Sequence, residues 1–406
     1  MDNNVLCKFA VALKICIKFC YMTEGYIHRT MSEAIIEASQ YFPVITLTGP
    51  RQSGKSTLLR HIFPSLPYRS MEEPDLRNIA RIDPKGFLAS FPDGVIIDEV
   101  QHVPELLSYI QGIVDDNPQR RFYLSGSSQF SLLKEVTQSL AGRTAVFELL
   151  PLSLAEIAGI RKDENVDTML YSGFYPAVWS GKNLPRLLYP NYIKTYLERD
   201  VRDLLAIKDL DLFQRFIRLC AARIGSIFNA SELSNELGVA VNTVNSWLSV
   251  LQASYIIYLL PPFFTNTRKR LTKSPKIYFT DSGVASYLLD IDSPQIMNRD
   301  KMRGHLFENM VIMNFLKDRF NRGTANGGIY FYRDSNGNEV DLLVREGSQY
   351  DCYEIKSSAT FHTDFTNGLN NFHKNYPELV KGESIIYTGE TMPELNGIRI
   401  INFKDI

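Results

Sequence analysis

The sequence predicts an α/β protein in three parts: a parallel-sheet domain, a helical middle region and a second α/β domain at the C-terminus. Three observations favour this division. Apolar β-branched runs alternate with helical patterns over residues 26–152, as in a doubly wound parallel sheet. Helical patterns then dominate residues 153–225, and a helix-turn-helix spacing follows within 226–295. Strand patterns that carry acidic residues return in residues 296–406.

Composition excludes several classes of protein. The 406 residues suffice for two or three domains, and the fractions of hydrophobic (45%) and charged (22%) residues are typical of a soluble globular chain. The formal net charge of −1 excludes a global basic field, so nucleic acid could bind only through local patches. Five cysteines form no C-x-x-C pair, and six histidines show no zinc-ligand spacing. This pattern fits a reducing cytosol, so we expect a cytoplasmic protein.

Residues 1–25 form an N-terminal extension whose role the sequence leaves open. Lys8, Lys14 and Lys18 interrupt its apolar run, so it lacks an uncharged stretch of membrane length and we expect no membrane partner. A secretory signal has a similar outline, but no small-residue cleavage site follows. The third interpretation, which we favour, is that translation begins at Met22 or Met31.

The pattern G-x-x-x-x-G-K-[ST], or P-loop, follows a strand-like run at residues 44–48 and precedes a helical pattern. Gly49 and Gly54 allow the backbone to turn tightly, so that a row of N–H groups faces a polyphosphate at the helix N-terminus. Lys55 can reach the β- and γ-phosphates, and Ser56 offers a hydroxyl to Mg²⁺. The sequence therefore predicts a site for ATP and Mg²⁺. The residues expected to bind the nucleotide are Gly49, Pro50, Arg51, Gln52, Ser53, Gly54, Lys55, Ser56 and Thr57.

A second apolar strand, residues 94–99, ends in two carboxylates. A short strand at 68–71 and a helical segment at 72–84 lie between it and the P-loop. A buried strand that ends in Asp-Glu in a P-loop protein is typical of the Walker B motif. We therefore expect Asp98 to hold the Mg²⁺ shell and Glu99 to polarise the attacking water.

The next strand, residues 121–124, runs into small hydroxyl residues. P-loop ATPases with an extra central strand place a polar group here near the γ-phosphate, so Ser127 or Ser128 is a candidate to sense it. An ordinary polar loop is the alternative. Arg143 is a candidate to stabilise the transition state, either within the chain or from a neighbouring subunit of an oligomer, and a plain surface arginine is the alternative. We predict a last strand at residues 146–150.

In the middle region, we predict helices at residues 230–239 and 241–253, separated as in a helix-turn-helix. The leading turn of the second helix carries Asn242, Thr243, Asn245 and Ser246. This helix contains no Arg or Lys, so we do not expect it to read bases.

Strands predicted at residues 255–260 and 276–280 flank a loop that resembles the wing of a winged helix. Its basic residues are Arg268, Lys269, Arg270, Lys273 and Lys276. A basic wing can bind the phosphates of DNA, and a purely structural role for this region is the alternative.

The C-terminal part carries a second group of acidic residues and a lysine. A long helix begins near Gly304 and carries Glu308, a strand at 339–344 carries Asp341, and a strand at 351–356 carries Glu354 and Lys356. Residues Glu354 and Lys356 share one face of their strand by the period-2 rule. We expect Asp341 and Glu354 to bind Mg²⁺, with Glu308 as a further ligand, and Lys356 to steady a nucleophilic water or a scissile phosphate. A solvated ion pair on an exposed strand is the alternative.

Over about residues 26–406, the chain resembles the prokaryotic AAA-like P-loop ATPases that carry a C-terminal domain of unknown function. The matching segments are residues 49–57, 98–101 with Pro104, 124–128, 142–143, Gly304 with Glu308, 339–341 and 354–356. The C-terminal elements are similar to restriction-type nucleases of the P-D-(D/E)-x-K class, with Val340-Asp341 in place of the leading Pro-Asp. The resemblance implies an ATPase domain (26–152), a helical lid or linker (153–225), a winged helix-turn-helix (226–295) and a nuclease-like domain (296–406).

Two hypotheses follow. In the first, the nucleotide state of an ATPase controls a DNA-directed, Mg²⁺-dependent nuclease module. In the second, the protein is a nucleotide-switched binding or signalling protein, and its nuclease-like domain is inactive and serves for contacts.

Overall fold

The computed structural model describes residues 26–127, 136, 138–161, 164–196, 209–264, 274–324 and 328–406. Several predictions concern residues outside these ranges: the extension 1–25, Ser128, the helical segment 197–201 and the wing residues Arg268, Lys269, Arg270 and Lys273.

The N-terminal part contains a parallel five-stranded sheet, as predicted, with the order β2-β3-β4-β1-β5. The strands are β1 (Val44–Thr48), β2 (Tyr68–Ser70), β3 (Gly94–Asp98), β4 (Arg121–Ser125) and β5 (Thr144–Glu148). Every residue of β1 and β3 is buried, because helices cover both faces of the sheet. Strand β4 lies between β1 and β3, so the segments that follow these three strands meet at one edge. Strand β5 begins two residues before its predicted start, since Thr144 pairs with Val44 of β1.

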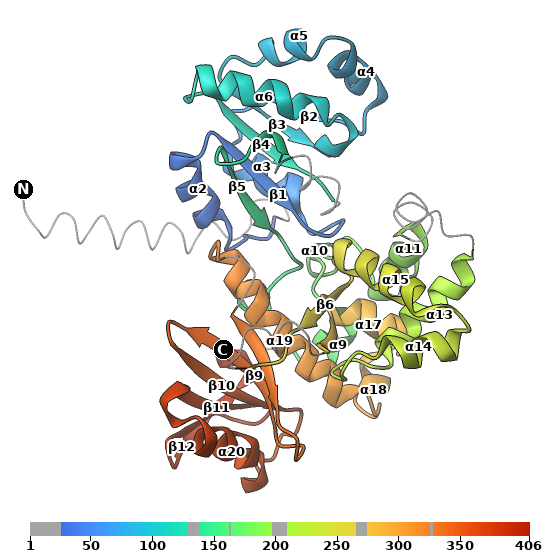
Figure 1. The fold of residues 1–406 in the computed structure, drawn as a ribbon, viewed down its shortest axis with the longest axis vertical. Coiled ribbons are helices and arrows are strands. Elements are labelled where there is room, and N and C mark those ends of the chain that lie inside the picture. Colours follow the sequence, from blue (N-terminus) through green and yellow to red (C-terminus); the bar gives the residue numbers. More distant parts are fainter. Residues whose placement is uncertain are drawn as a thin grey trace, which may run out of the picture.

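Helices surround this sheet in the upper part of Figure 1. They are α2 (Ser32–Tyr41), α3 (Lys55–Ile62), α4 (Pro74–Ile82), α5 (Pro84–Ala89) and α6 (Glu105–Asp116), with a 3-10 turn η1 (Val100–His102). One apolar cluster packs α5 and α6 against the sheet and includes Phe87, Ile110 and Phe122. The P-loop helix α3 packs through Leu58 and Leu59 into a different cluster, which extends into the rest of the molecule.

In the residues of the middle part that the structure describes, the regular elements are helices and one hairpin. Its helices are α8 (Leu154–Ala158), α9 (Val166–Ser172), α10 (Pro176–Trp179), α11 (Pro185–Tyr196), α13 (Leu210–Ala221), α14 (Ala230–Leu237), α15 (Val241–Ala253), α17 (Ser282–Leu288) and α18 (Pro294–Met297). Helix α14 ends at Gly238, whose φ of 69° is left-handed, and α15 has its predicted bounds. The hairpin pairs β6 (Ile257–Leu260) with β7 (Lys276–Phe279) in antiparallel fashion, and Ile227 forms an additional bridge to Lys276.

The C-terminal part combines a mixed six-stranded sheet with the long helix α19 (Arg303–Asn321) and with α20 (Asn367–Asn375). In spatial order the strands are β12 (Met392–Leu395), β13 (Ile398–Asn402), β11 (Val380–Tyr387), β10 (Gln349–Lys356), β9 (Glu339–Glu346) and β8 (Ile329–Arg333). Three 3-10 turns complete this part: η3 (Thr363–Thr366), η4 (Pro377–Leu379) and η5 (Phe403–Asp405). The pairs β10–β11 and β11–β13 are parallel, and the other pairs are antiparallel.

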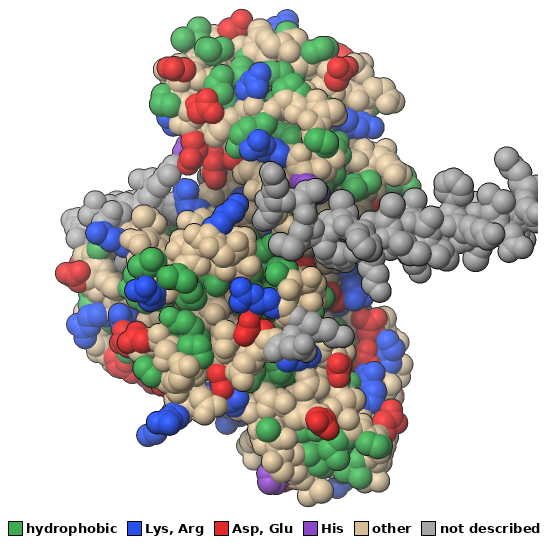
Figure 2. Space-filling model, turned by 180° about the vertical axis from the view of Figure 1, so that it is seen from behind, with side chains coloured by type: hydrophobic (Ala, Val, Ile, Leu, Met, Phe, Trp, Pro, Cys, Tyr) green, Lys and Arg blue, Asp and Glu red, His purple; other side chains and the backbone are tan. Residues whose placement is uncertain are grey.

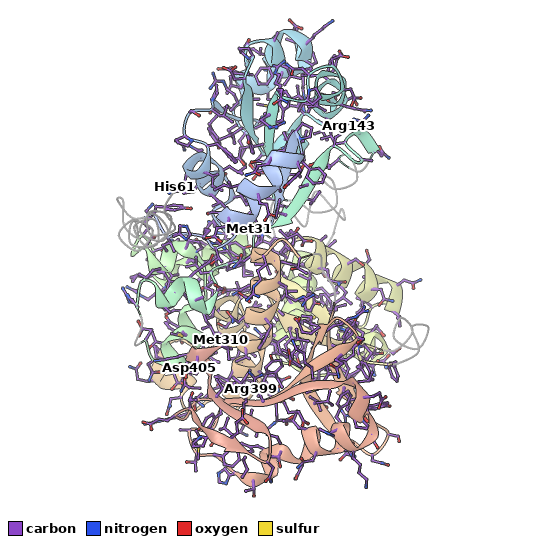
Figure 3. All side chains as sticks on the ribbon, turned by 90° about the vertical axis from the view of Figure 1, so that its left-hand side faces the viewer. Met31, His61, Arg143, Met310, Arg399 and Asp405 are labelled. Carbon is purple, nitrogen blue, oxygen red and sulfur yellow. The ribbon has the colours of Figure 1, made fainter. Side chains whose placement is uncertain are left out.

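The three parts share one hydrophobic core. A single cluster of buried residues extends from Met31 to Phe403, and α19 contacts β5, β7 and β10, one strand from each part. Met31 lies where the N-terminal part meets the rest of the molecule (Figure 3), and Figure 1 shows α19 running between that junction and the C-terminal sheet. On the face shown in Figure 2, Lys and Arg side chains are interspersed with Asp and Glu, in keeping with the absence of a global field.

Candidate functional site

The P-loop connects β1 to α3, and its two glycines adopt backbone conformations that other residues rarely take. Gly49 has a φ of 140°, and a Cβ there would come within 2.2 Å of the Leu149 carbonyl oxygen. Gly54 has a φ of 95° and directly precedes α3, which begins at Lys55. Only glycine satisfies both positions without strain, so the loop can present its N–H groups at the start of the helix.

The side chain of Lys55 folds back and binds the backbone of its own P-loop. Its side-chain nitrogen donates hydrogen bonds of 2.8 Å to the carbonyl oxygens of Gly49 and Pro50, and the residue is only 5% exposed. Phosphate oxygens are stronger acceptors for an ammonium group than neutral carbonyls. The arrangement therefore suits an exchange of these two carbonyls for a polyphosphate.

Asp98, at the end of β3, is held by three hydroxyl groups. Its Oδ2 atom accepts hydrogen bonds of 2.7 Å from Ser56 and from Tyr68, and its Oδ1 atom accepts one from Ser125. Burial and the neighbouring Asp98 carboxylate raise the pKa of Tyr68, which keeps its hydroxyl a donor. The structure thus brings together Ser56 and Asp98, the two residues predicted to hold Mg²⁺. Sequence reasoning missed Tyr68, which begins β2 beside β3, and Ser125, which ends β4 between β3 and β1.

Glu99 follows in a left-handed conformation with a φ of 49°. Its Oε2 atom accepts hydrogen bonds from the Gln101 side chain and from the Ser127 backbone N–H and hydroxyl, the last two at 3.3 and 3.1 Å. Ser127 therefore contacts the predicted water-activating residue, and its predicted role at the γ-phosphate stays a prediction.

A pocket of about 510 Å³ adjoins these residues. Its walls come from the chain before α2, from the P-loop with Asp98 and Glu99, from Glu72, and from the region of α10 and α11. The lining residues from the last segment are Pro176, Ala177, Ser180, Lys182 and Thr195, none of which the sequence had marked. The predicted residues Arg51, Gln52, Ser53, Gly54, Lys55, Ser56 and Thr57 all line the pocket. Gly49 and Pro50 contribute instead by binding Lys55.

Arg143 is not brought to this pocket. It directly precedes β5, and its carbonyl accepts a hydrogen bond from Val44 N–H at the start of β1, so it lies at the edge of the sheet opposite the P-loop. Its guanidinium forms an ion pair with Asp115, with an Nε–Oδ1 distance of 2.5 Å. Figure 3 shows it away from the junction near Met31. A role for Arg143 within its own chain is therefore not supported, because a whole strand separates it from the phosphate site.

In the C-terminal part, Asp341, Glu354 and Lys356 lie together, and we call them the acidic–lysine centre. The Lys356 side-chain nitrogen lies 2.5 Å from Glu354 Oε1 and 3.5 Å from Asp341 Oδ2, and the backbone N–H of Ile355 donates to Asp341 at 2.8 Å. Asp341 and Glu354 are 7% and 8% exposed, so these are not solvated side chains of an exposed strand. Burial, then the Asp341 charge, raises the pKa of Glu354 to about 8. The Oε2 atom of Glu354 has no hydrogen-bond partner among the described residues.

Glu308 has different partners. Its Oε1 atom accepts a 2.5 Å hydrogen bond from the Tyr278 hydroxyl and lies 3.3 Å from the side-chain nitrogen of Lys276, which also pairs with Glu339. Burial raises the pKa of Glu308. Lys276 is 3% exposed, so its prediction as part of a basic wing surface is wrong: it lies in β7 and its charge is used internally.

The residues of the C-terminal part do not form a ready metal site. Nowhere in the described ranges do three or more His, Cys, Asp or Glu side chains gather in a group that could hold a metal ion. Lys356 lies beside both carboxylates of the acidic–lysine centre, and Glu308 is bound to Lys276. Binding of Mg²⁺ by Asp341 and Glu354 stays a prediction.

Comparison with known families divides the chain into three consecutive matches. Residues 41–158 match an AAA domain, residues 163–295 match the domain of unknown function DUF8612, and residues 303–406 match the domain of unknown function DUF4143. Among the described helices, none is both long enough and apolar enough to cross a bilayer.

Solved structures give only distant likenesses. The Walker-type ATPase paby2304 of Pyrococcus abyssi is 15% identical, with 64% of this chain and 94% of that chain covered and a TM-score of 0.44. A signal transduction ATPase with numerous domains from Pyrococcus horikoshii, PH0952, is 11% identical, with 74% and 47% covered and a TM-score of 0.29.

Curated proteins give closer relatives. The uncharacterized proteins Mb2031c of Mycobacterium bovis and Rv2008c of Mycobacterium tuberculosis are both 30% identical over 321 residues, which cover 78% of this chain and 71% of theirs. The uncharacterized protein MJ1544 of Methanocaldococcus jannaschii is 24% identical over 347 residues, with 76% and 74% covered. With its P-loop, its Asp98–Ser56 pair and its parallel sheet, the chain belongs to the family of these mycobacterial proteins and carries an AAA-type ATPase domain followed by two domains of unknown function.

Proposed function

We propose that the protein binds ATP at the P-loop pocket and hydrolyses it. The observation that carries this proposal is the hydrogen bond between Ser56 and Asp98 beside the closed loop around Lys55, at the wall of a pocket of about 510 Å³. A hydroxyl and a carboxylate oxygen are ligands that Mg²⁺ prefers, so the donor set fits the ion. When bound, Mg²⁺ would offset charge on the phosphates.

The residues of the chain have separate roles in this proposal. Lys55 leaves its two carbonyls to bind the phosphates, while the N–H groups at the start of α3 orient them. Glu99 orients the attacking water, and Ser127 holds the Glu99 carboxylate in place through two hydrogen bonds. The pocket wall from α10 and α11 covers the bound nucleotide from the side of the middle part.

Phosphate release and ATP binding in matched variants test the proposal. Lys55→Ala should weaken ATP binding, because it removes the cation of the loop. Glu99→Gln should bind ATP like the wild type and release phosphate at least ~100-fold more slowly. Asp116→Asn is the control, since Asp116 is an exposed carboxylate at the end of α6. Wild-type rates in Glu99→Gln would show that Glu99 does not activate the water.

We further propose that the winged helix-turn-helix predicted for residues 226–295 is present, with α13 as an additional helix before it. The support is the order of three helices, α13 to α15, followed by the β6–β7 hairpin, with Ile227 as a third paired segment. DNA is the candidate partner, but four of the five basic wing residues lie outside the described residues and Lys276 is internal. The test compares the DNA affinity of the wild type with that of a variant in which four residues are changed to Ser: Arg268, Lys269, Arg270 and Lys273. Equal affinities would indicate that the region has only a structural role.

The second candidate function is cleavage of nucleic acid at the acidic–lysine centre. In its favour, Lys356 contacts both Asp341 and Glu354, and the three residues lie on two paired strands, β9 and β10. The residues as arranged do not fit a Mg²⁺ ion held by three carboxylates, so we derive no step that depends on one. The rival hypothesis, a nucleotide-switched protein with an inactive C-terminal domain, draws support from the internal pairing of Lys276 with Glu308 and Glu339.

Cleavage of mixed DNA substrates separates these two hypotheses. The wild type, Lys356→Ala and Lys55→Ala are incubated with each of several divalent metals, with and without ATP. Cleavage that is lost in Lys356→Ala and altered in Lys55→Ala would support an ATP-controlled nuclease. ATP hydrolysis without cleavage under any of the metals would support the switch.

A further inference from the structure

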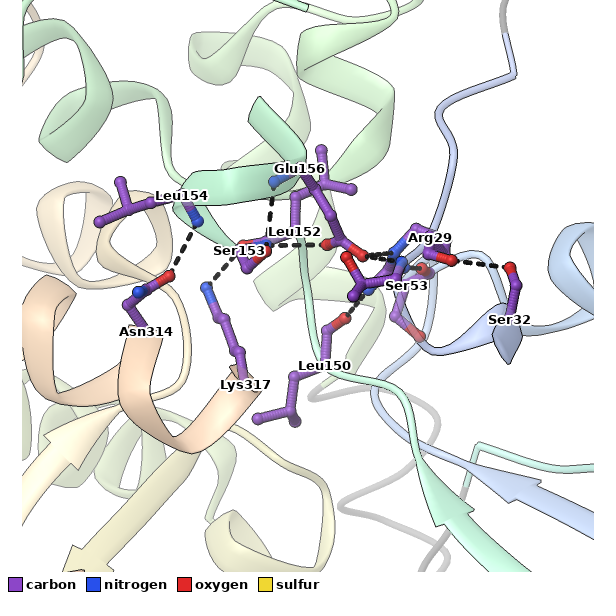
Figure 4. Close-up of polar contacts among 11 residues, drawn as sticks. Arg29, Ser32, Ser53, Leu150, Leu152, Ser153, Leu154, Glu156, Asn314 and Lys317 are labelled. Atoms are coloured by element: carbon purple, nitrogen blue, oxygen red, sulfur yellow. Dashed lines mark hydrogen bonds and ion pairs between the residues drawn. The ribbon is translucent and has the colours of Figure 1, made fainter. Parts of the chain in front are cut away.

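Arg29 lies in the segment before α2, outside every motif considered above and outside the matched AAA domain. Its side chain is 4% exposed, and its guanidinium group makes three hydrogen bonds to buried acceptors (Figure 4). The Nε atom donates to Glu156 Oε1 at 3.0 Å, Nη1 donates to the Ser53 carbonyl oxygen at 2.7 Å, and Nη2 donates to the Leu150 carbonyl oxygen at 2.7 Å. One buried arginine therefore connects the P-loop, the segment after β5 and helix α8.

The bond to Ser53 bears directly on phosphate binding. Ser53 precedes Gly54, and the peptide between them is trans and planar, so the Ser53 carbonyl and the Gly54 N–H point in opposite directions. When Arg29 fixes the direction of this carbonyl, it also fixes the direction of the Gly54 N–H. This N–H belongs to the row at the start of α3 that would face a polyphosphate.

The Ser53–Gly54 peptide needs an external restraint because residue 54 is a glycine. Gly54 is in the left-handed region and has no side chain to hold it, so the peptide before it can rotate at little steric cost. Lys55 cannot supply the restraint, because it binds Gly49 and Pro50 and would leave them for phosphate. The Arg29 fork is planar and always charged, which suits it to hold several carbonyl and carboxylate oxygens at fixed angles.

Glu156 anchors the arginine. Its side chain is 1% exposed, and its two oxygens accept hydrogen bonds from Arg29, from the Thr30 backbone N–H at 2.8 Å and from the Ser153 backbone N–H at 2.9 Å. Its own backbone N–H donates to the Ser153 hydroxyl oxygen, which caps the helix, so Glu156 is fixed at the start of α8 (Figure 4). Removing either charge would leave the other buried without its partner, which is strongly unfavourable. The pair therefore stays in place whether or not the pocket holds a ligand.

We propose that Arg29 is a positioning residue of the nucleotide site: anchored by Glu156, it holds the Ser53–Gly54 peptide in the orientation that binds the phosphates of a nucleoside triphosphate. The proposal rests on the proposed binding of ATP at the P-loop. Its three donor nitrogens already have protein acceptors, so Arg29 acts through the loop rather than on the phosphates.

The decisive variant is Arg29→Lys in the full-length protein. A lysine keeps the charge beside Glu156, but a single ammonium group does not reproduce the planar fork that reaches both carbonyls. We expect the dissociation constant for ATP to rise by roughly 10-fold or more, the scale of one lost charge-assisted hydrogen bond. Arg303→Lys is the matched control, because Arg303 makes a similar fork, to Asp167 at 2.6 Å and to the Ser357 carbonyl at 2.7 Å, far along the chain from the P-loop.

A second variant protects the test against loss of folding. Arg29→Ala is titrated with ATP in the presence and absence of methylguanidinium, which can occupy the vacated space and donate to the same oxygens. Recovery of ATP affinity with methylguanidinium, without an equal effect on wild type, is the expected result. Recovery of the melting temperature alone would indicate a structural role and overturn the proposal.

The outcomes for this inference and for the proposed function are distinct. Wild-type protein that fails to bind ATP overturns both. Wild-type binding with unchanged affinity in Arg29→Lys overturns the role of Arg29 alone. Weakened affinity in Arg29→Lys, with wild-type affinity in Arg303→Lys, supports it.

Discussion

The P-loop pocket and the acidic–lysine centre both combine carboxylates with a lysine, and they differ in what those groups are bound to. In the pocket, Lys55 binds two neutral carbonyls and Asp98 binds three hydroxyls. In the centre, Lys356 lies against two carboxylates, and nearby Lys276 binds Glu308 and Glu339. These hydrogen bonds join Lys55 and Asp98 to neutral groups, whereas Lys356 and Lys276 lie against carboxylates.

This difference has a consequence for ligands. A polyphosphate with Mg²⁺ brings both signs of charge, so its phosphates can replace the two neutral carbonyls at Lys55 while Mg²⁺ meets the carboxylate of Asp98. A divalent ion at the acidic–lysine centre would compete with Lys356 for the oxygens of Asp341 and Glu354 that Lys356 contacts, and recruitment of Glu308 would compete with Lys276. The first site is prepared for its ligand, whereas the second must rearrange before it can bind a metal.

The largest expected effect concerns Asp98. Asp98→Asn replaces one carboxylate oxygen by an amide N–H₂, which would face hydroxyl donors and cannot offer Mg²⁺ a charged ligand. We expect phosphate release to fall at least ~100-fold. Asp115→Asn, which loses only the exposed pair with Arg143, should stay within about 2-fold of wild type. Asp98→Asn with near-normal turnover would remove the claim that this carboxylate serves the reaction.

The two lysines should differ in their effect on stability. Lys276→Met leaves Glu308 and Glu339 without their buried cation, and we expect the free energy of unfolding to fall by about 3–5 kcal/mol. Lys55→Met removes hydrogen bonds to two carbonyls at a pocket, for which we expect a loss of only about 1–2 kcal/mol. Urea denaturation measures both. Equal losses of unfolding free energy in the two variants would contradict the proposed difference between the internally paired Lys276 and the P-loop residue Lys55.

The pH dependence of stability should report on Glu354. Its pKa is raised to about 8 in the folded protein from an ordinary value of 4.5, so between these values the folded state binds more protons than the unfolded state. The stability that this group contributes is therefore complete below pH 4.5 and is lost as the pH rises through about 8, by at most about 1.4 kcal/mol per pH unit. Urea unfolding at pH 5 and pH 8 should show a smaller loss in Glu354→Gln than in wild type. Glu346→Gln, which changes an exposed carboxylate, should keep the wild-type loss; an unchanged loss in Glu354→Gln would contradict the assignment.

The smallest effect is expected at Arg143. Its ion pair with Asp115 is exposed to solvent, so Arg143→Met should leave the melting temperature close to that of the wild type and change turnover by less than about 2-fold. Phosphate release measured over a range of protein concentrations checks this expectation. A defect that grows with protein concentration would instead support the predicted action of Arg143 on a neighbouring subunit.

Local patterns in the sequence predicted most of the elements. The P-loop, the Asp98 strand and helix α15 were found because a few adjacent residues define each of them: glycines with a lysine, an apolar run that ends in carboxylates, and a helical period that a glycine precedes. The parallel sheet followed from the alternation of such segments.

What the sequence missed depends on contacts between distant segments. Arg29 and Glu156 are 127 positions apart; Arg29 belongs to no motif, and the Ser153-x-x-Glu156 capping box marks only the start of a helix. Lys276 was placed on a basic surface because its neighbours in sequence are basic, but β7 pairs with β6 and directs Lys276 toward α19 and β9. The α10–α11 wall of the pocket contains ordinary residues that gain a role only through their position opposite the P-loop.

A titration with Mn²⁺ tests the contrast between the two sites most directly. Binding is measured as the decrease of the electron paramagnetic resonance signal of the free ion. Titrations are run with and without a non-hydrolysable ATP analogue, in the wild type, Asp98→Asn and Glu354→Gln. We predict tight binding of one ion per chain only in the presence of the nucleotide, lost in Asp98→Asn and kept in Glu354→Gln. Tight binding without nucleotide that disappears in Glu354→Gln would contradict the account, because the acidic–lysine centre would then be an open metal site.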